Sequence, residues 1–265
     1  MARQRQDEIL DLLQLRGQCS ITELADRLSV SGETIRRDIR KLADDGTVEA
    51  VRGGVALPEV VRETAFRYCL LEEVEAKQAI ARRAAAEVEN GDRLFLAGGS
   101  TMVYFAYALR SHLELTVITN SIDIARLLVT RNGNRVLVAG GEVDARNGCV
   151  EGPLAVDFVR GFYAAKAIVS SAWVHTSGEL MHDEVDSAEI TRAMLECAEQ
   201  RIVLADHTRF GGQGLVRIVG VDEIDALATD KALSAEFTAA IEAAGVRLLV
   251  ADEDAEMLQA AAVAS

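Results

Sequence analysis

Residues 30–42 combine a stripe of apolar side chains with a cluster of cations. Ile35, Ile39 and Leu42 are spaced i, i+4 and i+7, so on a helix they share one face. The side chains on the opposite face and its flanks, which suit DNA phosphates and base edges, are those of Thr34, Arg36, Arg37, Arg40 and Lys41. A solvated helix face, with Asp38 offsetting one charge, explains the pattern equally well, so the neighbouring sequence must decide.

Glycines and short polar residues recur at three predicted strand ends, in residues 97–101, 119–121 and 140–142. Glycine lets the backbone approach a ligand, and the free amides at a helix start can hold an anion together with nearby hydroxyls. Turns favour the same residues for structural reasons. Because three such turns at successive strand ends converge on one crevice, we favour a site for a phosphate-bearing small ligand. Its candidate residues are Gly98, Gly99, Ser100, Thr101, Thr119, Asn120, Ser121, Gly140 and Gly141.

Histidines and carboxylates gather in the loop-rich stretch 173–186 and just beyond it. Metal sites need ligands at suitable spacing, and neither His-x-x-x-His nor a similar spacing occurs here, so we predict no metal and no cofactor. Solvated loop residues explain the cluster most simply, and polar contacts to a sugar by His182, Asp183 and Glu189 are the alternative. The four cysteines are scattered without a Cys-x-x-Cys pair, which favours buried thiols in a reducing cytoplasm.

The cation-rich run lies among elements that would present it. Residues 3–16 and 21–28 are predicted as helices, and a tight turn at 29–31 precedes a third helix that begins at Ser31 and ends before Gly46. Two short β-prone runs flank Arg52-Gly53-Gly54 and predict a hairpin. Three helices followed by a hairpin predict a winged helix-turn-helix over residues 1–57.

After a linker at 58–74, apolar strands alternate with helices. Strands are predicted at 93–96, 115–118, 135–139, 167–170, 201–205, 226–229 and 247–250, and helices at 73–89, 101–110, 121–130, 154–161, 187–199 and 232–244. This alternation predicts a larger α/β domain over residues 75–252, with a mostly parallel sheet covered by helices on both faces. An Ala-rich tail follows at 253–265.

The charge of the chain is distributed unevenly. The 265 residues carry a formal net charge of −14, yet residues 1–57 hold nine Lys/Arg against ten Asp/Glu. Nearly all the acidity therefore lies in the predicted α/β domain, which suits a protein that touches DNA through one small surface. With no apolar leader and no run of about 18 apolar residues, we expect a cytoplasmic protein without a membrane span.

A longer pattern joins the N-terminal elements, made of Arg5-Gln6, Ile9-Leu10, Leu24-Ala25, Leu28, Val30-Ser31, Thr34-Ile35-Arg36-Arg37-Asp38-Ile39, Leu42, Gly46 and Arg52-Gly53-Gly54. In this pattern the chain resembles the DeoR family of bacterial transcriptional regulators, of which Thr-Ile-Arg-Arg-Asp is the most distinctive run. The resemblance implies that the third helix enters a major groove and that the wing lies near the DNA backbone or the minor groove. The residues that would then contact phosphates or bases are Ser31, Thr34, Arg36, Arg37, Arg40 and, on the wing, Arg52.

The resemblance extends into the α/β domain. Sensor domains of this family are similar in fold to ribose-5-phosphate isomerase and typically respond to phosphorylated sugars, and Gly152 matches a further landmark. Three positions depart from the family pattern: Ala97 stands where an aspartate is usual, and Thr191 and Arg209 stand where lysines are usual. Because lysine is a point charge and arginine a planar fork, we expect an atypical effector or a phosphate pocket with altered sugar selectivity.

Three functions are compatible with the sequence. The leading one is an effector-controlled DNA-binding regulator, a repressor of a sugar or polyol catabolic operon, which the resemblance implies works as a homodimer or homotetramer. The rivals are a sugar-phosphate isomerase with a DNA-binding arm, which Thr191 at the expected lysine position disfavours, and a ligand-independent DNA-binding protein. The sequence does not fix the effector, the operator, the assembly state or the direction of the response.

Overall fold

The computed structural model describes residues 5, 6, 8–10, 12, 13, 18–28, 30–56, 66 and 69–251. Its internal contacts divide the chain into two units, one of Met1–Tyr68 with Ala145–Asn147, the other of Cys69–Asp144 with Gly148–Ser265. Much of the predicted linker, at 58–65, 67 and 68, and the whole predicted tail lie outside the described residues, whereas residues 69–71 are helical.

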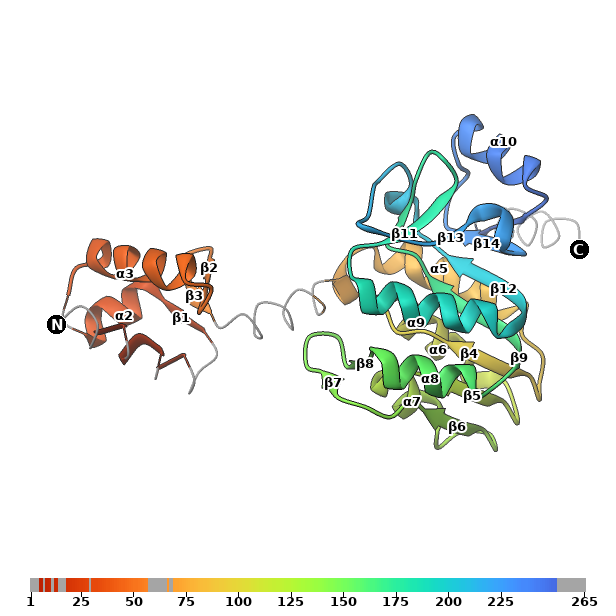
Figure 1. The fold of residues 1–265 in the computed structure, drawn as a ribbon, viewed down its shortest axis with the longest axis horizontal. Coiled ribbons are helices and arrows are strands. Elements are labelled where there is room, and N and C mark those ends of the chain that lie inside the picture. Colours follow the sequence, from red (N-terminus) through yellow and green to blue (C-terminus); the bar gives the residue numbers. More distant parts are fainter. Residues whose placement is uncertain are drawn as a thin grey trace, which may run out of the picture. The chain divides into compact units, whose positions relative to one another are not determined.

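The first unit is a winged helix-turn-helix, as predicted. Its elements are β1 (Gln18–Ser20), α2 (Ile21–Arg27), α3 (Gly32–Asp44), β2 (Glu49–Val51) and β3 (Gly54–Ala56) (Figure 1). The wing strands β2 and β3 pair antiparallel, and β1 completes the sheet in the order β1-β3-β2. The predicted helix over residues 3–16 lies partly outside the described residues, and Ile9 and Leu13 from it are fully buried.

The start, the buried face and the end of helix α3 follow the signals in its sequence. Ser31 caps it, because its hydroxyl accepts from the Thr34 amide at 3.2 Å. The apolar stripe Ile35, Ile39 and Leu42 is buried in the core of the first unit. Two residues past the helix end, Gly46 adopts the left-handed conformation that only glycine takes without strain, with φ 71°.

The second unit is built on a seven-stranded parallel sheet, which confirms the predicted α/β fold (Figure 1). The spatial order is β15-β14-β12-β9-β4-β5-β6. The strands are β4 (Arg93–Leu96), β5 (Thr116–Thr119), β6 (Arg135–Val138), β9 (Ala164–Ser170), β12 (Ala198–Leu204), β14 (Ala226–Thr229) and β15 (Arg247–Val250). The chain therefore runs outward from β4 in one direction and later returns to build the other half from β9, which makes the β4–β9 boundary a topological switch point.

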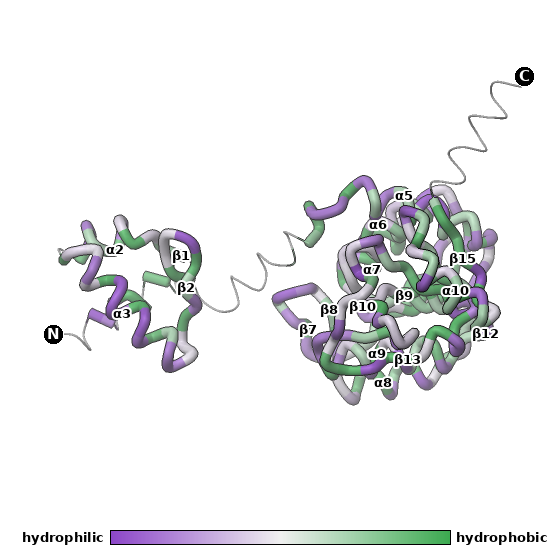
Figure 2. Tube along the Cα trace, turned by 90° about the horizontal axis from the view of Figure 1, so that it is seen from above, coloured by the Kyte–Doolittle hydropathy of each residue, from purple (hydrophilic) through white to green (hydrophobic). Residues whose placement is uncertain are grey.

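Helices cover both faces of this sheet. One core contains residues of α5 (Val74–Ala85), α6 (Ser100–Ala108) and α7 (Ile122–Leu128), and the other contains residues of α8 (Pro153–Arg160), α9 (Val185–Glu196) and α10 (Ala235–Ala243). Neighbouring β4 residues alternate between them, since Leu94 packs into the first core and Phe95 into the second. Figure 2 shows the hydrophobic colour concentrated inside this unit. Over the described residues, no helix has the length and apolar character to cross a membrane.

Two small antiparallel sheets were not predicted. One joins β10 (Trp173–Val174), β11 (Glu179–His182) and β13 (Val216–Gly220), and the other is a hairpin of β7 (Val143–Asp144) and β8 (Cys149–Val150). The loop prediction for 173–186 was therefore wrong in part, because β11 pairs with β13, whose residues lie far along the chain. The helix predicted to reach residue 199 ends at Glu196, since residues from Ala198 onward pair with β9 as a strand.

Candidate functional site

The surface of α3 that faces away from its core is cationic. Arg36, Arg37, Arg40 and Lys41 are exposed, and Arg52 is exposed at the turn between β2 and β3. Of these, Arg36 pairs with Glu33 across one helical turn at 3.4 Å. The Ser31 and Thr34 hydroxyls lie 2.9 Å apart at the N-terminus of the helix. The structure thus presents the predicted DNA-contacting residues on one helix start, one helix face and one wing turn.

Asp38 does not offset this cationic face. It is 2% exposed and accepts hydrogen bonds from Arg5 Nε at 2.6 Å and from Gln6 Nε2 at 3.3 Å. Its carboxylate therefore ties α3 to Arg5 and Gln6 and does not pair with the surface cations of α3. This removes the observation that favoured an ordinary solvated face.

The three predicted ligand loops lie next to one another, because β4, β5 and β6 are neighbours in a parallel sheet. A direct bond joins the first two, as the Gly98 amide donates to Asn120 Oδ1 at 2.9 Å. Gly98 also packs against Cys149 of β8, where a Cβ atom would clash with the thiol. The third loop holds Gly140 and Gly141, and a Cβ on Gly141 would lie 2.7 Å from Val150.

Most polar side chains of these loops have structural partners. Thr119, Asn120 and Ser121 are buried. The Thr119 hydroxyl accepts from the Ser121 amide at 3.1 Å, and the Ser121 hydroxyl caps α7 by accepting from Ile124 at 3.4 Å. These hydrogen bonds hold the loops in place at the carboxyl ends of the strands.

The start of α6 is the part of these loops best suited to an anion. Gly99 is its N-cap residue, and among the described residues no side chain caps this helix. The first amides of α6 are therefore available to a ligand, with the half-buried Ser100 and the buried Thr101 beside them. Gly99 has φ 137°, and a Cβ there would lie 2.7 Å from the Ser170 hydroxyl at the end of β9. The loop thus lies at the switch point between β4 and β9.

Arg209 brings a cation to the same edge of the sheet, in the turn His207–Arg209 that follows β12. Its Nε lies 3.3 Å from Asp206 Oδ2, and its guanidinium stands 5.9 Å from the centre of the Trp173 ring. Asp206 is buried, which opposes its ionisation, but hydrogen bonds from Thr208 and the charge of Arg209 outweigh burial and lower its pKa. Arg209 is thus held between a carboxylate and an aromatic face.

The residues proposed from stretch 173–186 and α9 are only partly brought together. Asp183 accepts from Trp173 Nε1 at 3.0 Å, which links it to the ring beside Arg209. His182 Nδ1 accepts from the Glu184 amide, and burial lowers the pKa of His182 against the opposing charges of Asp183 and Glu184. Glu189 is exposed on α9, and Gly152 is the N-cap residue of α8 with φ 86°.

Lys77 is a charged residue near this edge that the sequence did not single out. Its side chain is fully buried on α5. Burial lowers its pKa, and the charge of Asp206 opposes that effect. The sequence pattern could have identified Lys77, because position 77 lies on the same helix face as the apolar residues Ile80, Ala84 and Val88. A lysine is unusual on such a face.

In the described part of the chain, no group of three or more His, Cys, Asp or Glu is placed so that it could hold a metal ion. None of the four cysteines, all of which the structure describes, forms a disulfide: Cys19 and Cys149 are buried, and Cys69 and Cys197 are half-buried. Burial raises the pKa of Cys149 to about 12, so this thiol stays protonated at neutral pH.

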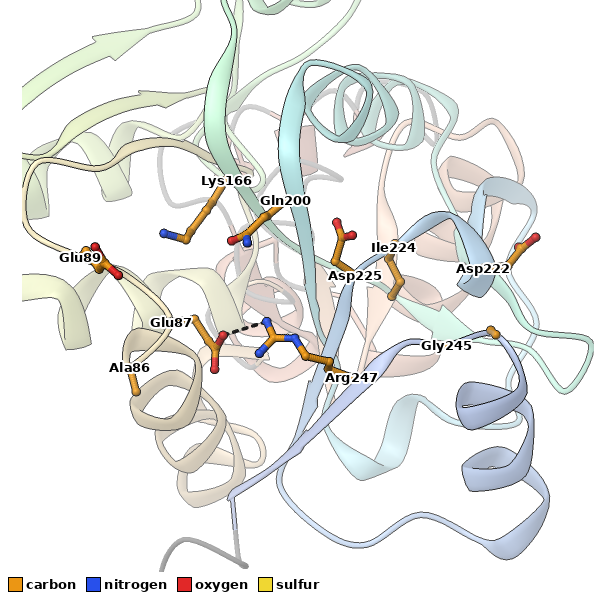
Figure 3. Close-up of a pocket in the computed structure, with 11 residues that line it drawn as sticks. Ala86, Glu87, Glu89, Lys166, Gln200, Asp222, Ile224, Asp225, Gly245 and Arg247 are labelled. Atoms are coloured by element: carbon orange, nitrogen blue, oxygen red, sulfur yellow. Dashed lines mark hydrogen bonds and ion pairs between the residues drawn. The ribbon is translucent and has the colours of Figure 1, made fainter.

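A polar pocket of about 730 Å³ lies at the opposite edge of the sheet, near the amino ends of the strands (Figure 3). Its cations are already paired with carboxylates, since Arg247 bonds Glu87 at 2.9 Å and Lys166 bonds Asp92 at 2.6 Å. An anionic ligand would have to displace these partners, so we do not assign the effector to it.

Comparison with known proteins assigns both units to described families. Residues 5–61 match the DeoR-like helix-turn-helix domain, and residues 72–231 match the DeoR C terminal sensor domain. The chain is 34% identical to the HTH-type transcriptional repressor CsqR of Escherichia coli (strain K12), over 95% of this chain and 96% of that protein. It is 31% identical to the glycerol-3-phosphate regulon repressor of the same organism, over 86% and 90%. It is 30% identical to the repressor GlcR of Bacillus subtilis (strain 168), over 93% and 95%.

Proposed function

Because the chain belongs to the DeoR family of transcriptional regulators, we propose that it represses a sugar or polyol catabolic operon and responds to a phosphorylated sugar. The DNA-binding part of this proposal rests on one face of α3, where four cationic side chains are exposed together, those of Arg36, Arg37, Arg40 and Lys41. Arg52 extends this surface to the wing.

The effector part of the proposal rests on the predicted crevice, which the three loops at the carboxyl ends of β4, β5 and β6 would form. The uncapped start of α6 offers backbone amides to a phosphate, and Arg209 offers a guanidinium held by Asp206 and Trp173. The polar side chains near Trp173 then contact the rest of the sugar. A relative with the printed name glycerol-3-phosphate regulon repressor supports a small phosphorylated compound as the effector class.

The regulator acts as a homodimer or homotetramer in this proposal. Residues 1–57 carry nearly balanced charges, so one winged helix supplies little general attraction to DNA. Two copies on half-sites about one helical turn apart, or a multiple of it, add their contacts. The effector controls repression by binding one arrangement of the pair more tightly than the other.

A thermal-shift screen of the full-length protein against sugar phosphates tests the proposal, followed by operator retention with the compound that stabilises it. We expect at least one sugar phosphate to raise the melting temperature and to change retention on operator DNA. If no compound stabilises the protein while DNA binding persists, the protein is a ligand-independent DNA-binding protein. Turnover of a pentose or hexose phosphate would instead establish an enzyme.

A further inference from the structure

Three backbone carbonyls in residues 69–72 accept hydrogen bonds from side chains elsewhere in the second unit. The ammonium of Lys77 donates to the carbonyl of Cys69 and, at 2.9 Å, to that of Glu72. The Tyr104 hydroxyl donates to the carbonyl of Leu70 at 2.6 Å. At Leu71, which follows Leu70, burial of the side chain contributes little to holding the segment in place, because this side chain is 74% exposed. Side-chain donors therefore hold the segment through which the second unit continues back toward the first.

Lys77 holds this segment by hydrogen bonds and also senses the charges of residues that follow β12. Its ammonium is buried, and both Asp206 and Arg209 act on it electrostatically. Its hydrogen bonds nevertheless go to neutral carbonyls. A hydrogen bond between an ammonium and an anion is stronger than one to a neutral carbonyl, and charges act strongly where water is excluded. An anion arriving beside Arg209 therefore competes with the carbonyls of 69 and 72 for Lys77.

Tyr104 connects the same segment to the glycine loop. It lies on α6 one turn after Ser100. Ser100 begins the N-terminal end of this helix, which is the end that we assign to the phosphate. A helix moves as a hydrogen-bonded body, so a shift of its first turn also shifts the Tyr104 hydroxyl. Helices α5 and α6 lie side by side (Figure 1), and each contributes one donor to the segment.

The junction between the segment and α5 is strained. Glu73, the N-cap residue of α5, has φ 47° and ψ 39°, a left-handed conformation that is unfavourable for a residue with a side chain. Its carbonyl accepts from the Lys77 amide at 2.9 Å. Such a conformation persists only where its surroundings enforce it. We therefore expect Glu73 to relax when Lys77 and Tyr104 no longer donate to the carbonyls of residues 69–72.

From these contacts we propose that Lys77 and Tyr104 are positioning residues that clamp residues 69–72 in the effector-free protein, and that an anion in the crevice releases this clamp. The proposal rests on the proposed function, because it takes the crevice as the effector site. It supplies the route by which occupancy of the second unit reaches the chain that leads to the DNA-binding unit.

The clamp itself is tested without ligand, by hydrogen exchange of the full-length protein. Tyr104→Phe removes only a hydroxyl, and Lys77→Met removes the ammonium while keeping an unbranched apolar chain. We expect each to speed amide exchange in residues 69–76 by about tenfold and to leave residues 18–56 unchanged. Tyr107→Phe is the matched control, because Tyr107 is an exposed tyrosine on the same helix. Wild-type exchange at 69–76 in Tyr104→Phe would overturn the clamp, even if Lys77→Met failed to fold.

The release is tested with inorganic phosphate as the probe, on wild type and Tyr104→Phe. We expect phosphate to slow exchange at 98–104 in both proteins and to speed exchange at 69–76 by a larger factor in the wild type than in Tyr104→Phe, which retains only the Lys77 bonds. Slower exchange at 98–104 with no change at 69–76 in the wild type overturns the release and leaves the effector site standing. No change at 98–104 overturns the release together with the proposed phosphate site, so the two failures are distinguished.

Discussion

The position of Asp38 distinguishes two interpretations of helix α3, as a DNA-binding surface or as an ordinary solvated helix face. In sequence it neighbours Arg37 and looks like a surface charge, but in the structure it is buried and bonded to Arg5. The spacing of Ile35, Ile39 and Leu42 already indicated which face is buried, and position 38 adjoins that stripe. What the sequence could not supply was the partner, because Arg5 lies 33 residues away.

Arg37→Ala tests the cationic face. The side chain is exposed on α3, so its removal should leave the fold intact and weaken operator affinity by roughly tenfold to a hundredfold, about 1–3 kcal/mol. Gel retention on operator DNA measures this, and Arg82→Ala, at an exposed arginine of α5, is the control. Equal retention by the two variants would remove α3 from the DNA interface.

His182 makes stability depend on pH. Burial holds its pKa below 6.5, so the unfolded chain binds the proton more readily and stability falls as pH drops through the region below 6.5. Protonation also breaks the bond in which Nδ1 accepts from the Glu184 amide. Urea unfolding from pH 7.5 to 5.5 should show a smaller loss of stability in His182→Gln than in wild type. Parallel curves would show that His182 is not buried in its neutral form.

At the scale of elements, sequence periodicity identified the main sheet and its helices but not the small sheets. The bounds of β4, β14 and β15 equal the predicted ones, because each is a short apolar run between turn residues. The prediction began this strand at Arg201, because Glu199 and Gln200 before it are polar, and only pairing with β9 extends the strand back to Ala198. The β10-β11-β13 sheet depends in the same way on partners distant in sequence.

For the candidate site, the sequence likewise predicted the loops but not the contacts between their side chains. Glycines and hydroxyls after strands marked the loops, because parallel strands bring their carboxyl ends to one edge. The sequence did not show that Thr119 and Ser121 bond to their own loop, nor that Lys77 is buried close enough to Asp206 and Arg209 for their charges to act on its pKa. Those facts depend on side-chain packing between elements that no spacing rule specifies.

Gly99 and Gly140 offer a matched test of the loop geometry. Gly99→Ala forces a side chain into a left-handed backbone at φ 137° and toward Ser170, so we expect a loss of about 1–3 kcal/mol in unfolding free energy. Gly140→Ala meets nothing within 4 Å and should change stability by less than about 0.5 kcal/mol. Urea denaturation measures both, and equal losses would contradict the tight turn before α6.

At the scale of the whole molecule, nearly all of the net charge of −14 lies outside residues 1–57. The second unit therefore repels DNA, and in the proposed homo-oligomer the contacts that paired copies add offset this repulsion. We expect sedimentation to give a dimer or tetramer, and operator affinity to fall when the protein is diluted below its association range. A monomer that binds a single half-site at full strength would contradict this.

The position of β4 in the sheet has a consequence for synthesis of the chain. β4 is the first strand of its unit to be made, yet its neighbour β9 begins at Ala164, and β12, β14 and β15 follow still later. The three strands of the first unit, by contrast, are complete once residue 56 has left the ribosome. Because domains fold in the order in which they emerge, a nascent chain carries a folded DNA-binding unit before its sensor exists. For that interval the newborn protein can meet DNA but cannot yet respond to an effector.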